Sequence, residues 1–177
     1  MREATNLARL RRLMEFLGGR CREAVDIYLV GGATAVLKGW RSLTVDVDFR
    51  MIPDSDALLR ELPQAKDKLN INIELASPAD FLPELPGWKD RSIFVEELGR
   101  LRFYHYDPYS QVLAKIERGH DKDLQDVENF FKSGLVEPDQ LMELFIAIES
   151  RLYRFPAIDA KSFRKAVEQT VSKFKEK

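Results

Sequence analysis

The chain has 177 residues, of which 45% are hydrophobic and 32% charged, and its formal net charge is −1. This composition excludes a disordered or fibrous protein, and no apolar run is long enough to span a membrane. Cys21 is the single cysteine, which excludes an intrachain disulfide and a cysteine-based zinc site. The N-terminus has no apolar signal core, so we expect a cytoplasmic protein that does not contact membranes.

The first forty residues alternate between helical and strand patterns. Apolar residues at helical spacing predict a helix that begins near Leu7 and ends at Gly18 and Gly19. A short apolar run over residues 27–30 predicts a buried strand, and a helical pattern resumes over residues 33–38. The sequence therefore predicts a helix, then a strand joined to a second helix by a tight glycine turn.

Period-two patterns follow. Apolar and polar residues alternate over residues 44–49, which predicts a strand with an acidic outer face. A helix is expected over residues 54–62, ending near Pro63, and a second half-buried strand over residues 69–75. Glu74 lies on the polar face of that second strand, so it extends the acidic face of the first.

The second half of the chain is helical. Prolines and a glycine over residues 76–90 predict a surface excursion, and two short strands around Gly99 predict a hairpin. Helical patterns then cover residues 108–118, 121–133, 137–152 and 160–175. We expect an α/β (α+β) fold: a small mixed sheet flanked by helices over residues 1–106, followed by a helical region over residues 107–177 packed on it.

Asp46 and Asp48 form the first candidate site. They are two residues apart on a strand, so both carboxylates project to one side, with α-carbons about 6 to 7 Å apart. Mg²⁺ binds one or two carboxylates and completes its shell with water and substrate phosphate. An ordinary exposed acidic face explains the same pair. Aspartate is a poor strand former, however, and like charges repel, so this placement favours a bound cation.

Gly31 and Gly32 form the second candidate site. They follow the buried strand and open the next helix, so phosphate oxygens could approach a backbone without side chains at a helix N-terminus. A simple tight turn is the alternative. The pattern matches neither the G-x-G-x-x-G of dinucleotide-binding folds nor the G-x-x-x-x-G-K-[ST] of P-loops, which removes support for both.

Glu74 is the candidate for a third carboxylate, acting as general base on an acceptor hydroxyl. Its support is its position on the polar face of a strand. An exposed glutamate without a role fits equally well. Asp80, Glu96 and Glu97 are rival positions for the same role.

A further block of charged residues lies in the predicted helices. Lys115 and Arg118 are three residues apart and share a helix face, where they could contact a phosphate tail or leaving pyrophosphate. Asp123 and Asp126 share a face of the next helix. A solvated helix surface would show the same pattern, so both readings stay open.

Together, these blocks resemble the nucleotidyltransferase superfamily of the polymerase-beta type. Within it, the chain is most similar to the branch of AbiEii-like abortive-infection toxins and related small, uncharacterised bacterial and archaeal nucleotidyltransferases. The resemblance covers roughly residues 25–133. It is carried by Gly31, Gly32, Arg41, Thr44, Asp46 and Asp48 in the first block and by Lys115, Arg118 and residues 122–126 in the second.

The resemblance implies transfer of a nucleoside monophosphate from an NTP to a protein or RNA acceptor, with loss of pyrophosphate. Asp46 and Asp48 would bind Mg²⁺, or Mn²⁺ in its place. The residues implied in nucleotide and phosphate binding are Gly31, Gly32, Arg41, Thr44, Lys115 and Arg118, with Asp123 as an orienting residue. A role in a toxin–antitoxin or phage-defence pair is implied too, with a cognate antitoxin or toxin as partner.

Two other function classes compete with this hypothesis. A catalytically degenerate nucleotidyltransferase fold could bind a nucleotide, RNA or protein without chemistry. The weak support for Glu74 and the basic ends of the chain favour that alternative: residues 1–24 and 159–177 each carry six Lys or Arg against three acids. A nuclease using the same carboxylates would leave the glycine turn unexplained. The acceptor, the preferred base and the oligomeric state stay open.

Overall fold

The computed structural model describes residues 2–177, which divide into two compact units. The sheet unit comprises the described residues up to Ser77 together with Ser92–Tyr106. The helical unit comprises Pro78–Arg91 and Asp107–Lys177. The predicted fold class, a mixed sheet with flanking helices and further helices at the C-terminal end, is confirmed.

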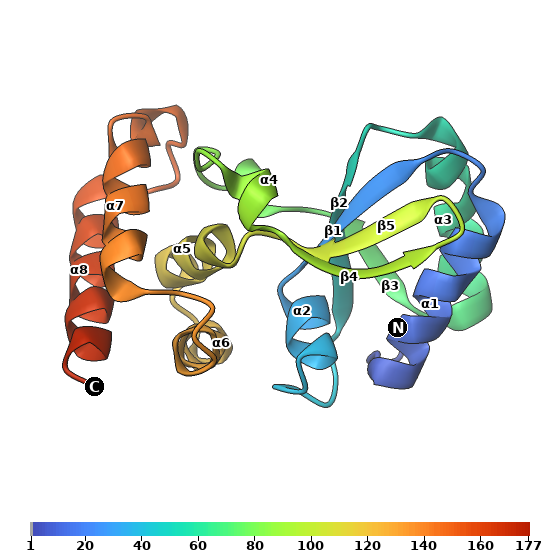
Figure 1. Cartoon of the computed structure of the whole chain (residues 1–177), viewed down its shortest axis with the longest axis horizontal. Helices are drawn as coiled ribbons and strands as arrows, with labels where there is room; N and C mark the ends of the chain where they lie inside the picture. Colours follow the sequence, from blue (N-terminus) through green and yellow to red (C-terminus); the bar gives the residue numbers. More distant parts are fainter. Residues whose placement is uncertain (1) are drawn as a thin grey trace. The chain divides into compact units, whose positions relative to one another are not determined.

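The described residues of the sheet unit form a five-stranded mixed sheet in the order β3-β2-β1-β5-β4 (Figure 1). The strands are β1 (Val25–Val30), β2 (Asp46–Ile52), β3 (Asn72–Leu75), β4 (Ile93–Leu98) and β5 (Leu101–His105). Strand β1 is antiparallel to β2 and parallel to β5. Strand β2 is parallel to β3, and β4 and β5 form the predicted antiparallel hairpin.

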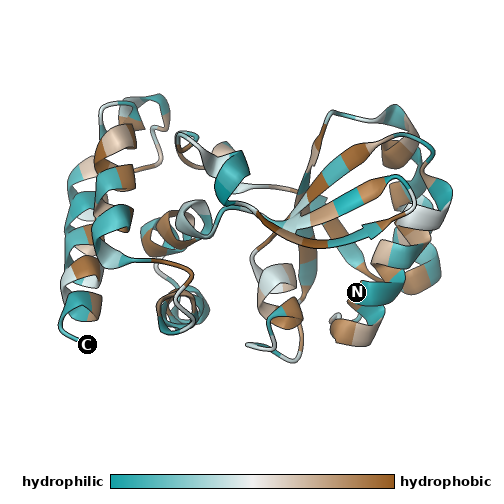
Figure 2. Ribbon diagram, in the orientation of Figure 1, coloured by the Kyte–Doolittle hydropathy of each residue, from teal (hydrophilic) through white to brown (hydrophobic). Residues whose placement is uncertain are grey.

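The helices α1 (Leu7–Arg20) and α3 (Asp56–Leu69) cover one face of the sheet, and the short α2 (Gly32–Leu37) follows β1. Hydrophobic and hydrophilic residues alternate along the strands (Figure 2), as expected where one face is buried. The core on that face includes Leu10, Leu13, Leu17, Ile27, Leu29, Val47, Phe49, Leu58, Leu62, Ile73 and Phe103. We call the opposite face, which carries Tyr28, Asp48, Arg50 and Tyr104, the polar face.

The predicted end of α3 at Pro63 is wrong, because the helix continues to Leu69 with Pro63 inside it. Proline removes one backbone hydrogen bond. Leu62 and Ala65, on either side of it, are buried in the sheet core, and this burial favours continuing the helix. Ser55 caps the helix at its start by accepting a hydrogen bond from the Leu58 backbone.

The predicted end of α1 at Gly18 and Gly19 is also wrong, because the helix runs on to Arg20. Gly18 lies against β4: a Cβ added there would be 2.7 Å from both the Cβ and the carbonyl oxygen of Leu98. Gly18 therefore allows the helix to approach the strand and does not end it. A Cβ at Gly19 would have no described atom within 4 Å.

Other differences from the predicted elements are smaller. Strand β3 begins at Asn72 and not at residue 69, because Leu69 ends α3 and Asn70 takes the left-handed conformation that terminates the helix. Strand β2 begins at Asp46 and extends to Ile52, beyond the predicted residues 44–49. The acidic face of β2 is therefore at the start of that strand.

The helical unit contains the four predicted C-terminal helices. They are α5 (Pro108–Arg118), α6 (Asp121–Lys132), α7 (Pro138–Glu149) and α8 (Ala160–Lys175), with a short η2 (Leu152–Arg154) between the last two. Its core includes Val112, Leu113, Ile116, Val127, Phe130, Leu141, Phe145, Ile148, Phe163 and Val167. None of the helices formed by residues 2–177 is long and apolar enough to cross a membrane.

The stretch over residues 76–90 is not the predicted surface excursion. It forms η1 (Pro78–Asp80) and α4 (Trp88–Arg91), and Leu82, Leu85 and Trp88 are buried in the helical unit, whereas Phe81 is 56% exposed. Arg91 donates from Nε and Nη2 to the two oxygens of the fully buried Asp107, at 3.0 and 2.8 Å. Asp107 also caps α5 by accepting from the Tyr109 backbone. The prolines of residues 76–90 therefore lie in a segment that packs into the helical unit.

Substituting the two glycines of α1 in turn tests the close approach of this helix to β4. Gly18→Ala should lower the free energy of unfolding by about 1 to 3 kcal/mol, since the new methyl group overlaps Leu98. Gly19→Ala is the matched control and should raise the free energy of unfolding by about 0.5 to 1 kcal/mol, since alanine favours helix. Urea denaturation measures both. Equal shifts for the two variants would contradict the packing described.

Candidate functional site

The predicted acidic residues of the sheet unit meet at one end of the sheet. Val30, the last residue of β1, pairs opposite Asp48 on the antiparallel β2. Asp48 in turn pairs in register with Glu74 on the parallel β3, and Asp46 with Asn72. Paired residues share a sheet face and neighbouring strands lie about 4.8 Å apart. The carboxylates of Asp46, Asp48 and Glu74 therefore gather on the polar face.

Asp46 is held in position from two sides. Its Oδ1 accepts a hydrogen bond from Asn72 Nδ2 at 2.9 Å, and its backbone oxygen accepts one from Thr44 Oγ1 at 2.9 Å. Asp46 and Asp48 are both half-buried, whereas Glu74 is exposed. The two aspartates are thus oriented by the sheet, and Glu74 is accessible to solvent.

Gly31 faces this group of carboxylates. Its φ of 61° and ψ of −122° form a conformation that residues with a side chain rarely adopt. A Cβ added to Gly31 would be 3.9 Å from Asp48 Oδ2, so the side of Gly31 that has no side chain is turned toward that carboxylate. Glycine here leaves room beside Asp48 for a ligand atom.

Gly32 packs directly against Thr44, unlike Gly31, which has space beside it. A Cβ on Gly32 would lie 1.9 Å from Thr44 Oγ1, so only glycine fits against this threonine. Thr44 is buried and exchanges two backbone hydrogen bonds with Thr5, at 2.7 and 2.9 Å. Arg41 follows α2 in the same loop and donates its backbone N–H to Ala35. Gly32 and Thr44 therefore fix the loop that precedes β2, while phosphate binding by them and by Arg41 stays a prediction.

The donor set fits a magnesium ion of the kind that binds together with a nucleotide. Among residues 2–177, no group of three or more His, Cys, Asp or Glu side chains is arranged to hold a metal ion. Mg²⁺ commonly uses one or two carboxylates and takes its other ligands from water and substrate phosphates. Asp46 and Asp48 on one strand face, with the bare backbone of Gly31 beside Asp48, match that requirement.

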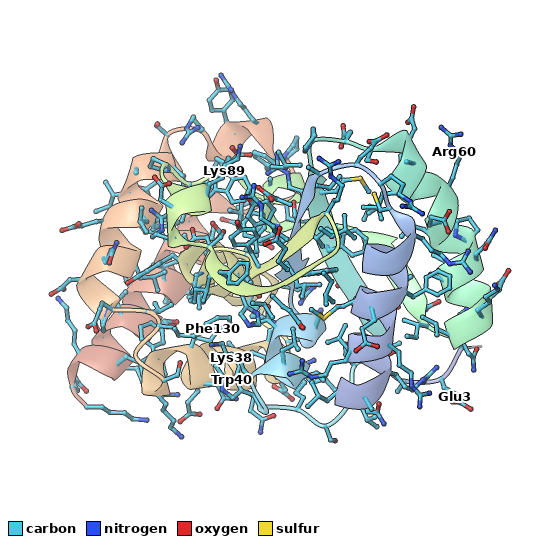
Figure 3. All side chains as sticks on the ribbon, turned by 45° about the vertical axis from the view of Figure 1, so that its right-hand side comes forward. Glu3, Lys38, Trp40, Arg60, Lys89 and Phe130 are labelled. Atoms are coloured by element: carbon cyan, nitrogen blue, oxygen red, sulfur yellow. The ribbon has the colours of Figure 1, made fainter. Side chains whose placement is uncertain are left out.

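His105, for which the sequence predicts no role, is a buried residue that contacts the helix following Gly31. It is 6% exposed at the end of β5, and its Nδ1 lies 3.0 Å from Thr34 Oγ1 on α2. Burial lowers the pKa of His105 to about 4, with a smaller effect from the charge of Lys38, which follows α2 (Figure 3). The imidazole is therefore neutral near pH 7 and ties α2 to the sheet.

The second predicted block, in the helical unit, is a buried ion cluster. Lys115 on α5 donates to Asp126 Oδ2 on α6 at 2.8 Å and lies 3.6 Å from Asp123 Oδ1. Arg118 Nε donates to Asp123 Oδ2 at 2.8 Å. Burial raises the pKa of Asp123, but the hydrogen bond from Arg118 and the charges of Lys115 and Arg118 outweigh it, so that pKa lies below its usual value.

The buried ion cluster holds α5 and α6 together. The side chains of Lys115, Asp123 and Asp126 are at most 5% exposed, so each buried charge depends on the others. Lys115 and Arg118 join α5 to α6 through the two aspartates. Contacts from Lys115 and Arg118 to a triphosphate, and an orienting role for Asp123 there, stay predictions.

Comparison with known proteins identifies the class. A family model described as "Nucleotidyltransferase of unknown function (DUF6036)" matches residues 5–176. The chain therefore belongs to this family of nucleotidyltransferases, which confirms the predicted nucleotidyltransferase class, while the AbiEii-like branch stays a prediction. The crystal structure of an antigenic nucleotidyltransferase-like protein from Paracoccidioides brasiliensis has a similar fold, with a TM-score of 0.52 and 14% identity over 94% of this chain and 95% of that chain. No curated protein matches the sequence.

The stability of the sheet unit should depend on pH through His105. Because its pKa falls from 6.5 to about 4 on folding, the folded state binds the proton more weakly. The contribution of His105 to the free energy of unfolding is then fully present above pH 6.5 and is lost as the pH falls toward 4. Between pH 7.5 and 5.5, His105 alone should lower the free energy of unfolding by about 1 kcal/mol. Urea denaturation of the wild type and of His105→Gln at both pH values measures it; an equal pH dependence in both would contradict this assignment.

The ion cluster predicts a large effect of Lys115→Ala. Removing the lysine leaves Asp126 buried without its cation, which should lower the free energy of unfolding by about 3 to 5 kcal/mol. Lys132→Ala is the control, because its ion pair with Glu128 is exposed and should contribute little. Replacing both partners, by Lys115→Met with Asp126→Leu, should recover much of the loss. Equal losses for Lys115→Ala and Lys132→Ala would disprove the structural role.

Proposed function

We propose that this protein is a Mg²⁺-dependent nucleotidyltransferase that moves a nucleoside monophosphate from an NTP to an acceptor hydroxyl. One observation carries the proposal: Asp46, Asp48 and Glu74 gather on one sheet face, and Gly31 turns its bare side toward Asp48. Membership of a nucleotidyltransferase family supports the same reaction class. A nuclease would need the carboxylates but would leave the geometry of Gly31 without a purpose.

Asp46 and Asp48 would hold the metal ion, and the phosphates of the NTP would bind to that ion and not to the carboxylates. Bound Mg²⁺ supplies neutralising charge for the phosphates and a template for the attacking and leaving oxygens. The hydrogen bond from Asn72 holds Asp46 in one orientation, so little reorganisation is needed when the nucleotide binds. Gly31 provides the space that the phosphate oxygens need beside Asp48.

Glu74 would serve as the general base. The acceptor oxygen attacks the α-phosphorus, the bond to pyrophosphate breaks, and the acceptor proton passes to the Glu74 carboxylate. Its register opposite Asp48 supports this role, and its exposure lets it return the proton to water. The rivals Glu96 and Glu97 have less support, because β4 lies at the opposite edge of the sheet and Glu96 is 3.7 Å from Arg11. Asp80 belongs to the helical unit.

The finer parts of the proposal rest on the motif resemblance to the AbiEii-like branch. They are a cytoplasmic location, an RNA or protein acceptor, and membership of a toxin–antitoxin or phage-defence pair. A cognate antitoxin or toxin should remain bound to the tagged chain through affinity and size-exclusion chromatography when the two are co-expressed. Complete separation of the two proteins would count against that pairing and would leave the transferase proposal intact.

Neutralising either aspartate tests the reaction. Asp46→Asn and Asp48→Asn should each lower pyrophosphate release by at least about 100-fold, since each removes charge from the metal site. EDTA should abolish the wild-type activity. Asp67→Asn is the matched control, since this aspartate is 77% exposed on α3. Circular dichroism should show all variants folded, because both site aspartates lie outside the core.

Two results would oppose the proposal. Full activity of Asp46→Asn or Asp48→Asn would exclude the metal assignment. Nucleotide binding that is independent of Mg²⁺ in calorimetry, without pyrophosphate release for any of the four NTPs, would instead favour the degenerate binding module.

A further inference from the structure

The polar face of the sheet carries a row of aromatic side chains beside the candidate site. Tyr28 on β1 pairs with Tyr104 on β5, and Tyr104 pairs with Phe94 on β4 (strands in Figure 1). The rings of Tyr28 and Tyr104 stack with centroids 5.1 Å apart, and Phe94 meets Tyr104 edge-on at 5.7 Å. We call these three residues the aromatic row.

The core of the sheet unit does not account for this row. That core lies on the other face, under α1 and α3. Phe94 is 55% exposed and Tyr104 is half-buried, so their rings present apolar area outside the core, whereas Tyr28 is 4% exposed and supports the Tyr104 ring from one side. Arg50, opposite Tyr28 on β2, brings a positive charge to the same face, with Nη1 3.4 Å from the Tyr106 hydroxyl. Exposed aromatic rings on a sheet face that also carries an arginine are typical of surfaces that bind single-stranded nucleic acid.

The position of the row relative to Asp48 indicates which ligand it meets. Gly31 follows Val30, which is opposite Asp48, whereas Arg50 lies two residues farther along β2 in the other direction, about 7 Å away. In-line transfer requires the leaving pyrophosphate and the attacking oxygen on opposite sides of the phosphorus. With pyrophosphate at Gly31, the acceptor approaches over Arg50 and the aromatic row.

We propose that the aromatic row and Arg50 bind the terminal nucleotides of a single-stranded nucleic-acid acceptor. An acceptor base stacks on the exposed rings of Phe94 and Tyr104, and Arg50 pairs with an acceptor phosphate. This inference rests on the proposed function, because it assigns the acceptor of the same reaction. The terminal hydroxyl of the strand attacks the α-phosphorus, pyrophosphate leaves, and the hydroxyl proton passes to Glu74. Stacking tolerates any base, so the row supplies affinity without reading sequence.

Binding without chemistry tests the aromatic row directly. Fluorescence anisotropy with a fluorescein-labelled ten-nucleotide single-stranded RNA, and with the matching DNA, is measured without NTP or Mg²⁺. Phe94→Ala and Tyr104→Ala should each raise Kd at least about fivefold, as expected for the loss of one stacking contact. Tyr104→Phe keeps the ring and should bind like the wild type.

Two controls accompany these variants. Tyr153→Ala removes a tyrosine that is 73% exposed in the helical unit and should leave Kd unchanged. Asp48→Asn should bind at least as tightly as the wild type, because it removes a negative charge near the acceptor. Absence of binding by the wild type to both strands, or equal Kd for Phe94→Ala and the wild type, would overturn the inference.

A labelling experiment separates this inference from the proposed function. The wild type and Phe94→Ala are incubated with α-labelled NTP, Mg²⁺, and total RNA and protein, and the product is digested with nuclease or protease. Nuclease-sensitive label that falls in Phe94→Ala supports the inference. Protease-sensitive label of equal strength in both proteins overturns it while the transferase proposal stands. Pyrophosphate release in neither protein, with RNA binding that still depends on Phe94, would reject the transferase proposal alone.

Discussion

The antiparallel register between β1 and β2 is the constraint on which the site depends. It puts Val30 opposite Asp48, so the turn at Gly31 leaves the sheet where the acidic end of β2 begins. A slip of one residue would turn Asp46 and Asp48 into the core, where unpaired carboxylates are costly, and would expose Val47 and Phe49. The burial of those two residues under α1 and α3 therefore fixes the carboxylates on the polar face. Stability and the candidate chemistry rely on the same pairing.

Charge is distributed differently in the two units. In the helical unit, each of the three buried aspartates has a cation: Asp107 has Arg91, Asp123 has Arg118, and Asp126 has Lys115. In the sheet unit, the clustered carboxylates are oriented by a neutral amide, Asn72, and by backbone pairing. An amide donor orients the Asp46 carboxylate without adding a charge to it. Buried ion pairs thus join the helices of the helical unit, whereas the orientation of Asp46 in the sheet unit depends on an amide.

Much of this fold could be predicted from local patterns, and the failures have a common cause. Period two identified the acidic strand and the strand bearing Glu74, and glycine and proline spacing separated the C-terminal helices. Glycine and proline also gave two wrong helix ends, because tertiary packing decides at those positions. Gly18 lets α1 pack closely against β4, and Pro63 lies inside a helix whose apolar face is buried. Pairing between distant residues left no local trace, as with Lys115 and Asp126 or the aromatic row, whose members come from three strands. His105 could have been noticed, because it alternates with Leu101 and Phe103 on the apolar face.

The route of the chain between the two units has a consequence for how such a protein can be divided. The backbone leaves the sheet unit after Ser77, returns at Ser92 and leaves again after Tyr106. Neither unit is a continuous segment, so cutting the chain at one point cannot release either of them whole. A fragment that starts at Asp107 would lack Arg91 and the buried Trp88, and the carboxylate that caps α5 would lose its guanidinium. Recombination between relatives would therefore have to exchange the segment over residues 78–91 together with the C-terminal helices. A single crossover cannot replace one unit and leave the other unchanged.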